Sequence, residues 1–377
     1  MLRLTEFFYD ALNDREHSLA VFIDLRRAFD TVNPSILIRK LFKYGIRGRF
    51  LNLMESYLNS RKQYVKINDY SSNTKTPRIG LPQGSVLGPL LFLFYVNDMP
   101  NISELFFTTL FADDTTLCLK GGSYENLVQN FNNELGIFSS WCNTNRLTIN
   151  LDKTAYMFIS NRNILVQRDI SLNGVPINSV SNCKFLGVIF DNRLSFCNHI
   201  DLVCSKVSKS IGIFYKLKDY LPLQSMISLY YSIIYPYFHY GILVWGGTYE
   251  THINRLVILQ KRALRIINNT EFRSHTNELF YSNKILKIRD IYNFHVAQIM
   301  YNGTMDISFE RQYNYSTRFV NDLLPEYQRL VSTQRSLRYM GPTIWNQLPS
   351  RIKNSESFPI FKRALKDFLI EKYNPLS

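Results

Sequence analysis

The stretch FFTTLFADDTTLCL (residues 106–119) places two adjacent acidic residues between two apolar segments. Each segment is rich in aromatic and β-branched residues, and a short polar break between two such segments predicts a β-hairpin. Ala112, Asp113 and Asp114 would form its turn. Adjacent carboxylates next to buried strands repel each other, and a bound cation would remove that cost. Taken alone, these residues are better explained by a solvated turn, because Asp favours turns.

A second acidic residue lies inside an apolar segment. Residues 19–25 read LAVFIDL, which fits a buried strand that contains Asp24. A lone aspartate in a strand is a weak signal of function. It gains weight only from its place in the ordered series of motifs described below.

The remaining pattern predicts an α+β fold. Pro34 suits the first position of a helix that ends near Gly45. Further helices are expected over residues 50–58, 85–95 and 125–144, with strands over 63–67, 155–159 and 185–190, and mostly helices from residue 199 to a last one at 358–373. This order fits an antiparallel sheet backed by helices.

Composition limits the class of protein. The 377 residues are 46% hydrophobic and carry a net charge of +14, so a folded core and a polyanionic partner are both expected. Charge alone does not separate a nucleic-acid binder from an ordinary basic protein. The apolar runs at 86–96 and 220–249 are too short or too interrupted to cross a membrane, and no signal peptide is visible.

The five cysteines are scattered, which favours reduced thiols and an intracellular protein, in the nucleus and cytoplasm. Cys197, His199 and Cys204 lie close in sequence, but their spacing fits no known zinc motif. Ordinary residues near a helix start explain them better.

Five motifs stand in order: AVFIDLRRAFDTV (20–32), GLPQGSVLGPLLFLFYVNDM (80–99), FADD (111–114), LTINLDKTAYMFIS (147–160) and KFLGVIFD (184–191). Together they closely resemble the reverse transcriptases of non-long-terminal-repeat retrotransposons, of the Jockey-like and chicken-repeat-like kind. The segments at 230–247, 260–267 and 341–369 are similar to the regions that follow the polymerase motifs in such elements. The resemblance therefore covers nearly the whole chain.

The resemblance implies a right-hand polymerase. Residues 1–190 would form the palm, an antiparallel sheet backed by helices, with residual fingers. Residues 191–270 would form a helical thumb-like region, and residues 271–377 a C-terminal helical region. The implied partners are an RNA template, a DNA primer or target, and deoxynucleoside triphosphates, with no membrane.

The implied reaction is RNA-directed DNA synthesis with two Mg²⁺ ions, for which Mn²⁺ can substitute. By the resemblance, Asp24 and Asp113 bind both ions, Asp114 supports them, and the backbone carbonyl of Leu25 completes one coordination shell. This agrees with two-metal chemistry, in which one ion activates the primer 3′-hydroxyl and the other neutralises the leaving pyrophosphate.

Other roles follow from the same resemblance. Phe29 would exclude a 2′-hydroxyl, although a core phenylalanine is the simpler reading of that residue alone. Gln83 and Gly84 would lie against the incoming nucleotide and template, or form only a structural turn. Lys153 would protonate the leaving pyrophosphate, or be a surface lysine. Asp30 would orient its motif.

The segment after the sheet carries a further expected function. Lys184, Phe185, Leu186 and Gly187 resemble the primer grip, where backbone groups and a basic side chain hold the primer strand.

The sequence also departs from the family pattern. Phe111 stands where tyrosine is usual, and only 23 residues precede Asp24. The basic fingers segments expected there are not seen, so an N-terminally truncated chain without robust activity is expected. The alternatives are a catalytically inactive nucleic-acid-binding fragment, or an interaction protein built on the helical half. A retron-like or intron-encoded enzyme fits the C-terminal segment less well.

Overall fold

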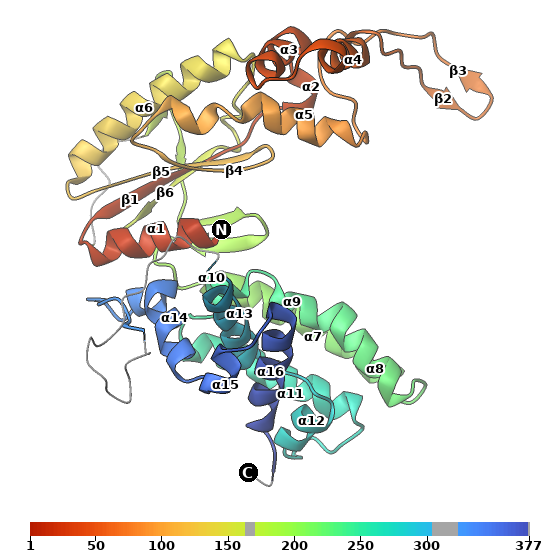
Figure 1. Cartoon of the computed structure of the whole chain (residues 1–377), viewed down its shortest axis with the longest axis vertical. Helices are drawn as coiled ribbons and strands as arrows, with labels where there is room; N and C mark the ends of the chain where they lie inside the picture. The colour runs from red at the N-terminus through yellow and green to blue at the C-terminus, as the bar shows by residue number, and fades with distance from the viewer. Residues whose placement is uncertain (163–169, 304–322, 376–377) are drawn as a thin grey trace. The chain divides into compact units, whose positions relative to one another are not determined.

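The computed structural model describes residues 1–162, 170–303 and 323–375 (Figure 1). The chain forms two compact units. The sheet unit is Arg15–Cys183, and the helical unit combines Met1–Asp14 with Lys184–Ser377. The expected division at residues 190 and 270 stays a prediction, and the two units are described here one at a time.

The sheet unit is built on five strands in the order β4-β5-β1-β6-β9. The strands β4, β5, β1 and β6 pair antiparallel, and β9 adds to β6 in parallel. All seven residues of the central strand β1 are buried, including the polar His17 and Ser18 that precede its apolar run at residues 19–23. The strand bounds are β1 His17–Ile23, β4 Phe107–Phe111, β5 Asp114–Gly121, β6 Ala155–Ile159 and β9 Asn178–Ser179. The α+β class and the hairpin at 106–119 are confirmed.

Helices pack on this sheet through the same apolar core (Figure 1). Asn33 caps α3: its Oδ1 accepts hydrogen bonds from the backbone N–H of Ser35 (3.0 Å) and Ile36 (3.2 Å), with Pro34 as the first helical residue. The helices are α2 Ala28–Thr31, α3 Pro34–Lys43, α4 Gly48–Asn59, α5 Leu87–Val96, α6 Tyr124–Thr144 and the 3₁₀ turn η1 Met99–Ile102. The helix predicted to start at Pro34 is confirmed.

Two short hairpins complete the unit. β2 (Lys66–Ile67) pairs with β3 (Tyr70–Ser71), and β7 (Ser171–Leu172) pairs with β8 (Val175–Pro176). The strand predicted over 63–67 is therefore shorter than expected. Lys66 and Ile67 form its ladder, Gln63 forms an isolated bridge with Lys75, and Val65 is joined to Ser72 by hydrogen bonds outside the ladder.

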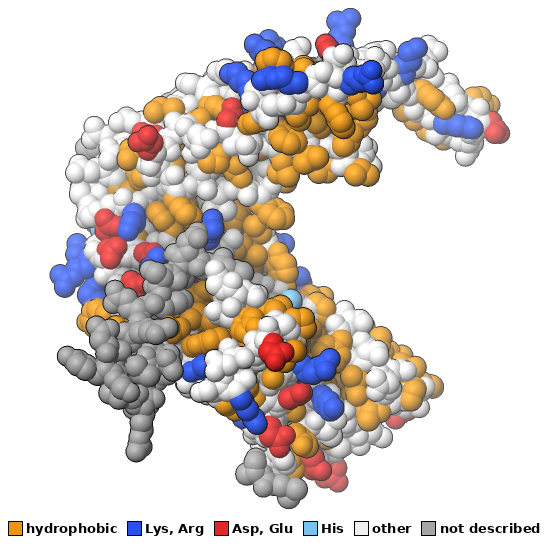
Figure 2. Space-filling view, viewed as in Figure 1, with side chains coloured by type: hydrophobic (Ala, Val, Ile, Leu, Met, Phe, Trp, Pro, Cys, Tyr) orange, Lys and Arg blue, Asp and Glu red, His pale blue; other side chains and the backbone are white. Residues whose placement is uncertain are grey.

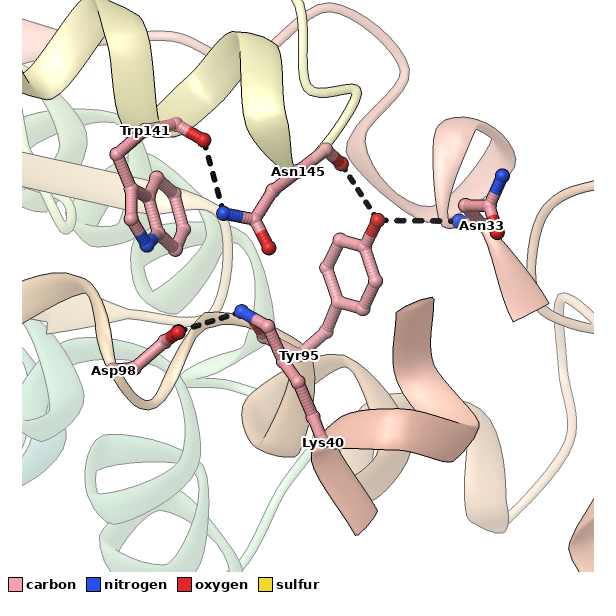
Figure 3. Close-up of polar contacts among 6 residues, drawn as sticks. All are labelled: Asn33, Lys40, Tyr95, Asp98, Trp141 and Asn145. Atoms are coloured by element: carbon pink, nitrogen blue, oxygen red, sulfur yellow. Dashed lines mark hydrogen bonds and ion pairs between the residues drawn. The ribbon is translucent and has the colours of Figure 1, made fainter. Parts of the chain in front are cut away.

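Polar contacts join α3, α5 and α6 (Figure 3). The hydroxyl of Tyr95 donates to the carbonyl of Asn145 (2.6 Å) and accepts from the N–H of Asn33 (3.3 Å). The ammonium of Lys40 donates to the carbonyl of Tyr95 and to Asp98, both at 2.6 Å. Burial lowers the pKa of Lys40, and its hydrogen bond with Asp98 opposes that shift. The helices behind the sheet are thus fixed by buried hydrogen bonds as well as by packing.

The helical unit begins with α1 (Leu2–Asn13), which contacts the C-terminal part of the chain. The carboxylate of Glu6 accepts a hydrogen bond from the N–H of Leu337 at 2.8 Å. The other elements are β10 Asn182–Phe185, β11 Val188–Asp191, α7 Cys197–Leu217, α8 Leu223–Leu229, the π-helix η2 Tyr230–Ile234, α9 Tyr235–His239, α10 Ile242–Trp245, α11 Glu250–Ile267, α12 Asn277–Ser282, α13 Ile288–Asn302, η3 Thr333–Arg335, α14 Leu337–Asn346, α15 Ser350–Lys353 and α16 Phe358–Glu371. No helix in the described part of the chain is both long and apolar enough to span a bilayer.

One predicted element is wrong. Residues 185–190 were expected to form one strand, but they form parts of β10 and β11, which are joined by a tight turn. Leu186 (φ +46°) and Gly187 (φ +84°) both adopt positive φ at this turn. Two successive positive φ values are the signature of the turn that best fits a two-residue hairpin. The sequence pattern did not indicate this turn, because leucine rarely adopts a positive φ.

Tyr95→Phe is expected to lower the free energy of unfolding by about 1–3 kcal/mol, because it leaves the carbonyl of Asn145 and the N–H of Asn33 without their partner. Urea denaturation of the full chain measures this. Tyr57→Phe is the matched control, since its hydroxyl makes no hydrogen bond with the described residues. Equal stability of the two variants would refute a structural role for the Tyr95 hydroxyl.

Candidate functional site

Asp24 directly follows the buried strand β1 and is half-buried. Its backbone N–H donates to Oγ1 of Thr154 (3.3 Å), and its carbonyl accepts from the N–H of Asn150 (2.8 Å). The side-chain amide of Asn150 also donates to Oδ2 of Asp24 at 2.8 Å. The segment that enters β6 therefore fixes both the backbone and the carboxylate of Asp24.

The other two carboxylates lie at the turn between β4 and β5. Phe111 pairs with Asp114, so Ala112 and Asp113 form the two-residue connection. Ala112 has a φ of +53°, which is an unfavourable conformation for a residue with a Cβ. Such strain persists where the surrounding structure requires it, and it is concentrated at functional sites. Both aspartates are exposed.

Strand register brings Asp24 to the acidic turn. The pairing of β1 with β5 runs to Ile23 opposite Thr115, so the next residues along the two strands are Asp24 and Asp114. Although its side chain reaches solvent, partial loss of hydration raises the pKa of Asp114, and the charges of Asp113 and Asp24 raise it further. Asp113 and Asp24 thus both lie within electrostatic reach of Asp114.

The types of ligand atom at this site determine whether it suits a divalent cation. Among the described residues, no group of three or more His, Cys, Asp or Glu side chains is arranged to hold a metal ion, and this applies to Cys197, His199 and Cys204 as well. Mg²⁺, however, is often bound by one or two carboxylates together with waters and substrate phosphates. The hard oxygens of Asp24 and Asp113 fit that requirement.

The backbone at Leu25 is also suitable for a ligand. Leu25 bridges Ile149, and the two hydrogen bonds of that bridge belong to its neighbours: Asn150 N–H to the Asp24 carbonyl, and Arg26 N–H to the Thr148 carbonyl (both 2.8 Å). The carbonyl of Leu25 takes no part in this bridge.

The GLPQG loop (residues 80–84) lies against the segment that follows Asp24. Gly80 N–H donates to the carbonyl of Val32 (2.7 Å), and Leu81 N–H donates to that of Phe29 (2.8 Å). Gly80 has a φ of +82°, and a Cβ there would lie 2.8 Å from the carbonyl oxygen of Asp30. Only glycine permits this close approach.

Three residues expected at a nucleotide site meet here. Phe29 is half-buried and stacks on Phe92 of α5, with ring centroids 4.6 Å apart. The side-chain amide of Gln83 donates to Oδ1 of Asp30 at 2.8 Å, and the orienting function of Asp30 stays a prediction. Gly84 has a φ of +78° and open space where a Cβ would be.

Lys153 is exposed in the turn between Asn150 and β6, where its backbone N–H donates to the Asn150 carbonyl at 3.2 Å.

The four residues of the expected primer grip, 184–187, belong to the helical unit. There the hydroxyl of Tyr240 donates to the carbonyl of Leu186 at 2.6 Å and fixes the turn.

Sequence reasoning missed Asn150, Thr154 and Gly80. Asn150 and Thr154 stand inside a motif that the sequence analysis did single out, but a polar residue before a strand has many structural explanations. The signal for Gly80 was its place before Leu-Pro, and the need for glycine appears only with the carbonyl of Asp30 packed against it.

Comparison with known proteins identifies the family of the chain. A family model described as "Reverse transcriptase (RNA-dependent DNA polymerase)" matches residues 3–190. The RNA-directed DNA polymerase from mobile element jockey of Drosophila melanogaster is 29% identical over 299 residues, which are 76% of this chain and 32% of that protein. The probable RNA-directed DNA polymerase from transposon BS of the same species is 29% identical over 281 residues, 72% of this chain and 31% of that protein.

The chain belongs to the reverse transcriptases of non-long-terminal-repeat retrotransposons. It spans about a third of the length of the curated relatives it matches. Among solved structures, apo telomerase from Candida tropicalis is similar, with 10% identity, a TM-score of 0.41, and coverage of 77% of this chain and 50% of that one.

Asp114→Asn is expected to raise the melting temperature of this reverse transcriptase at pH 7 without metal. The folded-state pKa of Asp114 lies above its unfolded value, so the folded state loses stability as the pH rises from the ordinary Asp pKa through that raised value. The gain should therefore shrink as the pH falls toward the ordinary Asp pKa. Thermal melts in a chelator across this pH range measure the effect.

The exposed Asp152, paired with Arg26 at 3.7 Å, offers a matched control. Asp152→Asn removes an equal charge but should not raise the melting temperature. If Asp114→Asn melts at or below the wild-type temperature at pH 7, repulsion among the three carboxylates is not a destabilising force.

Asn150→Ala removes the amide that donates to the carboxylate of Asp24. Because a hydrogen bond to a charged group contributes about 1.5–3 kcal/mol, the free energy of unfolding should fall by roughly that amount. Urea denaturation measures it, with the exposed Asn143→Ala as control. Asn150→Asp should be at least as damaging at neutral pH, since it places a like charge beside Asp24. Full tolerance of Asn150→Asp would contradict this.

Proposed function

We propose that this chain carries the nucleotidyl transfer site of an RNA-directed DNA polymerase. The observation that supports it best is the meeting of Asp24, Asp113 and Asp114, where the pKa of Asp114 is raised in part by the other two carboxylates. In the reaction, the primer 3′-oxygen forms a bond to the α-phosphorus of a deoxynucleoside triphosphate. The bond from that phosphorus to the pyrophosphate oxygen breaks, and the proton of the 3′-hydroxyl passes to solvent water.

Asp24, Asp113 and the carbonyl of Leu25 would hold two Mg²⁺ ions, with Asp114 as a supporting acid and Mn²⁺ as a possible substitute. The ions supply activation of the hydroxyl and neutralisation of the leaving group. The protein's own part is positioning. Asn150 and Thr154 hold Asp24 in place, and the strained turn at Ala112 presents Asp113.

Phe29, Gln83 and Gly84 would form the nucleotide pocket. Phe29 cannot easily retreat because Phe92 stacks behind it, so a 2′-hydroxyl on the incoming sugar would meet a fixed ring. Gln83 is oriented by Asp30. The exposed Lys153 would deliver a proton to the departing pyrophosphate.

Residues 1–190, which include the sheet, would serve as the palm with residual fingers, residues 191–270 as a helical thumb-like region, and residues 271–377 as a C-terminal helical region. The hairpin at Lys184, Phe185, Leu186 and Gly187 would hold the primer strand. Its support is the turn itself, where two positive φ values and the hydroxyl of Tyr240 fix the backbone. The proposed partners are an RNA template, a DNA primer or target, and deoxynucleotides.

Primer extension by the full chain on an RNA template with Mg²⁺ tests the proposal. We expect slow, template-directed incorporation of deoxynucleotides. Asp113→Ala should abolish it, because that carboxylate would bind both metal ions. Asp69→Ala, which removes an exposed carboxylate from the β2–β3 turn, is the control and should retain incorporation.

If the wild-type chain binds RNA with a steep salt dependence but incorporates nothing under any divalent ion, the proposal fails. The alternative, a nucleic-acid-binding protein without turnover, would then hold.

A further inference from the structure

Positive charge is concentrated in one segment of the sheet unit. Residues 39–79 contain ten Lys and Arg but only Glu55 and Asp69 as acids, so this segment carries +8 of the chain's net +14. The basic residues are Arg39, Lys40, Lys43, Arg47, Arg49, Arg61, Lys62, Lys66, Lys75 and Arg78. A polyanion is the partner that such a local excess attracts.

The end of this segment is a two-stranded ribbon at residues 61–79 in which 62–76 are all exposed. Gln63 and Lys75 exchange backbone hydrogen bonds of 2.9 and 2.8 Å, and β2 pairs with β3 beyond them. Figure 2 shows basic and apolar side chains next to each other along it. An isolated two-stranded ribbon is only marginally stable in water, which suits an element that binds a partner.

The two faces of the ribbon differ in chemistry. Lys62, Tyr64 and Lys66 are spaced by two along the ribbon, and in an extended segment this spacing predicts a shared face. Ile67 pairs with Tyr70 on the other. Tyr64 is 60% exposed and Tyr70 84%. An aromatic ring between two lysines is the pattern that holds a single strand, because bases stack on the ring while ammonium groups contact the phosphates.

A cavity of about 760 Å³ lies at the base of the ribbon. Arg61, Lys62 and Gln63 line it from the ribbon, and Asp30 and Gln83 line it from the candidate site. The guanidinium of Arg61 donates one hydrogen bond, to the carbonyl of Ile79 (2.7 Å). Its Nε is buried without a partner among the described residues. The cavity therefore links the basic ribbon to the loop proposed to contact the nucleotide.

We propose that the face formed by Lys62, Tyr64 and Lys66 binds a single strand of nucleic acid, which continues through this cavity toward Gln83. That the strand is the uncopied template rests on the proposed function. A base stacks on Tyr64, and Lys62 and Lys66 contact phosphates on either side of it. A protein partner fits less well, because lysine is depleted from the centre of protein interfaces.

Fluorescence anisotropy with the full chain and a labelled oligouridylate of about twelve nucleotides tests this, in a chelator and without deoxynucleotides. Tyr64→Ala should weaken binding about tenfold or more, since a base–aromatic stack is lost. Tyr70→Ala is the matched control on the opposite face of the same ribbon and should change affinity little. Both side chains are exposed, and circular dichroism verifies that each variant folds.

Lys62→Gln with Lys66→Gln should reduce the slope of log affinity against log salt by about 1.4, because two phosphate contacts are lost from a single strand. Lys362→Gln with Lys372→Gln removes the same charge from the helical unit and should leave the slope nearly unchanged. Both lysines are exposed, Lys362 within α16 and Lys372 at its C-cap.

The proposal is overturned if Tyr64→Ala binds like the wild type, if Tyr70→Ala is weakened as much, or if Tyr64→Ala instead converts a dimer to a monomer. Because this assay involves no catalysis, its outcome is independent of primer extension. Strand binding as expected in a chain that makes no DNA would support this inference while refuting the polymerase proposal.

Discussion

The pairing of β1 with β5 is the constraint on which the candidate site depends. Antiparallel register fixes which residues are neighbours, and a shift by one residue would turn every side chain to the other face. Here the register that buries Val21 opposite Leu117 also brings Asp24 to the end of the strand beside Asp114. The same burial that stabilises the sheet therefore positions the acidic groups, and neither can change without the other.

This arrangement has an electrostatic cost. Three carboxylates are held near one another, the pKa of Asp114 is raised, and Ala112 adopts a conformation that disfavours a Cβ. None of these features stabilises the fold by itself. A bound divalent cation would account for these features, because its positive charge offsets the repulsion among the carboxylates. The hydrogen bond from Asn150 to Asp24 offsets part of the cost before any cation binds.

The sheet unit contains two different kinds of surface around this site. The GLPQG loop is tightly held, with Gly80 against the backbone of Asp30 and Phe29 backed by Phe92. The ribbon at 61–79 is exposed on both faces and makes few contacts. Rigid packing suits side chains that would discriminate between nucleotides. An exposed ribbon suits a surface along which a nucleic-acid strand would move. Both lie along the cavity that Gln83 and Arg61 share.

The sequence alone determined the α+β class, the hairpin at 106–119, the helix that starts at Pro34, and the family. Each of these depends on local pattern: apolar periodicity, turn residues, a proline at a helix start, and ordered motifs. Candidate residues such as Asp24 and Asp113 could be named for the same reason, since they stand inside those motifs.

Only the tertiary structure decided which groups touch. The hydrogen bonds of Asn150 and Thr154 to Asp24 join residues about 130 positions apart, and no local pattern encodes such a contact. The need for glycine at position 80 appears only when the carbonyl of Asp30 occupies the space of a Cβ. The turn at Leu186 and Gly187 was hidden because leucine rarely takes positive φ, and the contact with Tyr240 that fixes it comes from a distant helix end. Local sequence sets what each segment prefers, and long-range packing selects which of these preferences are realised.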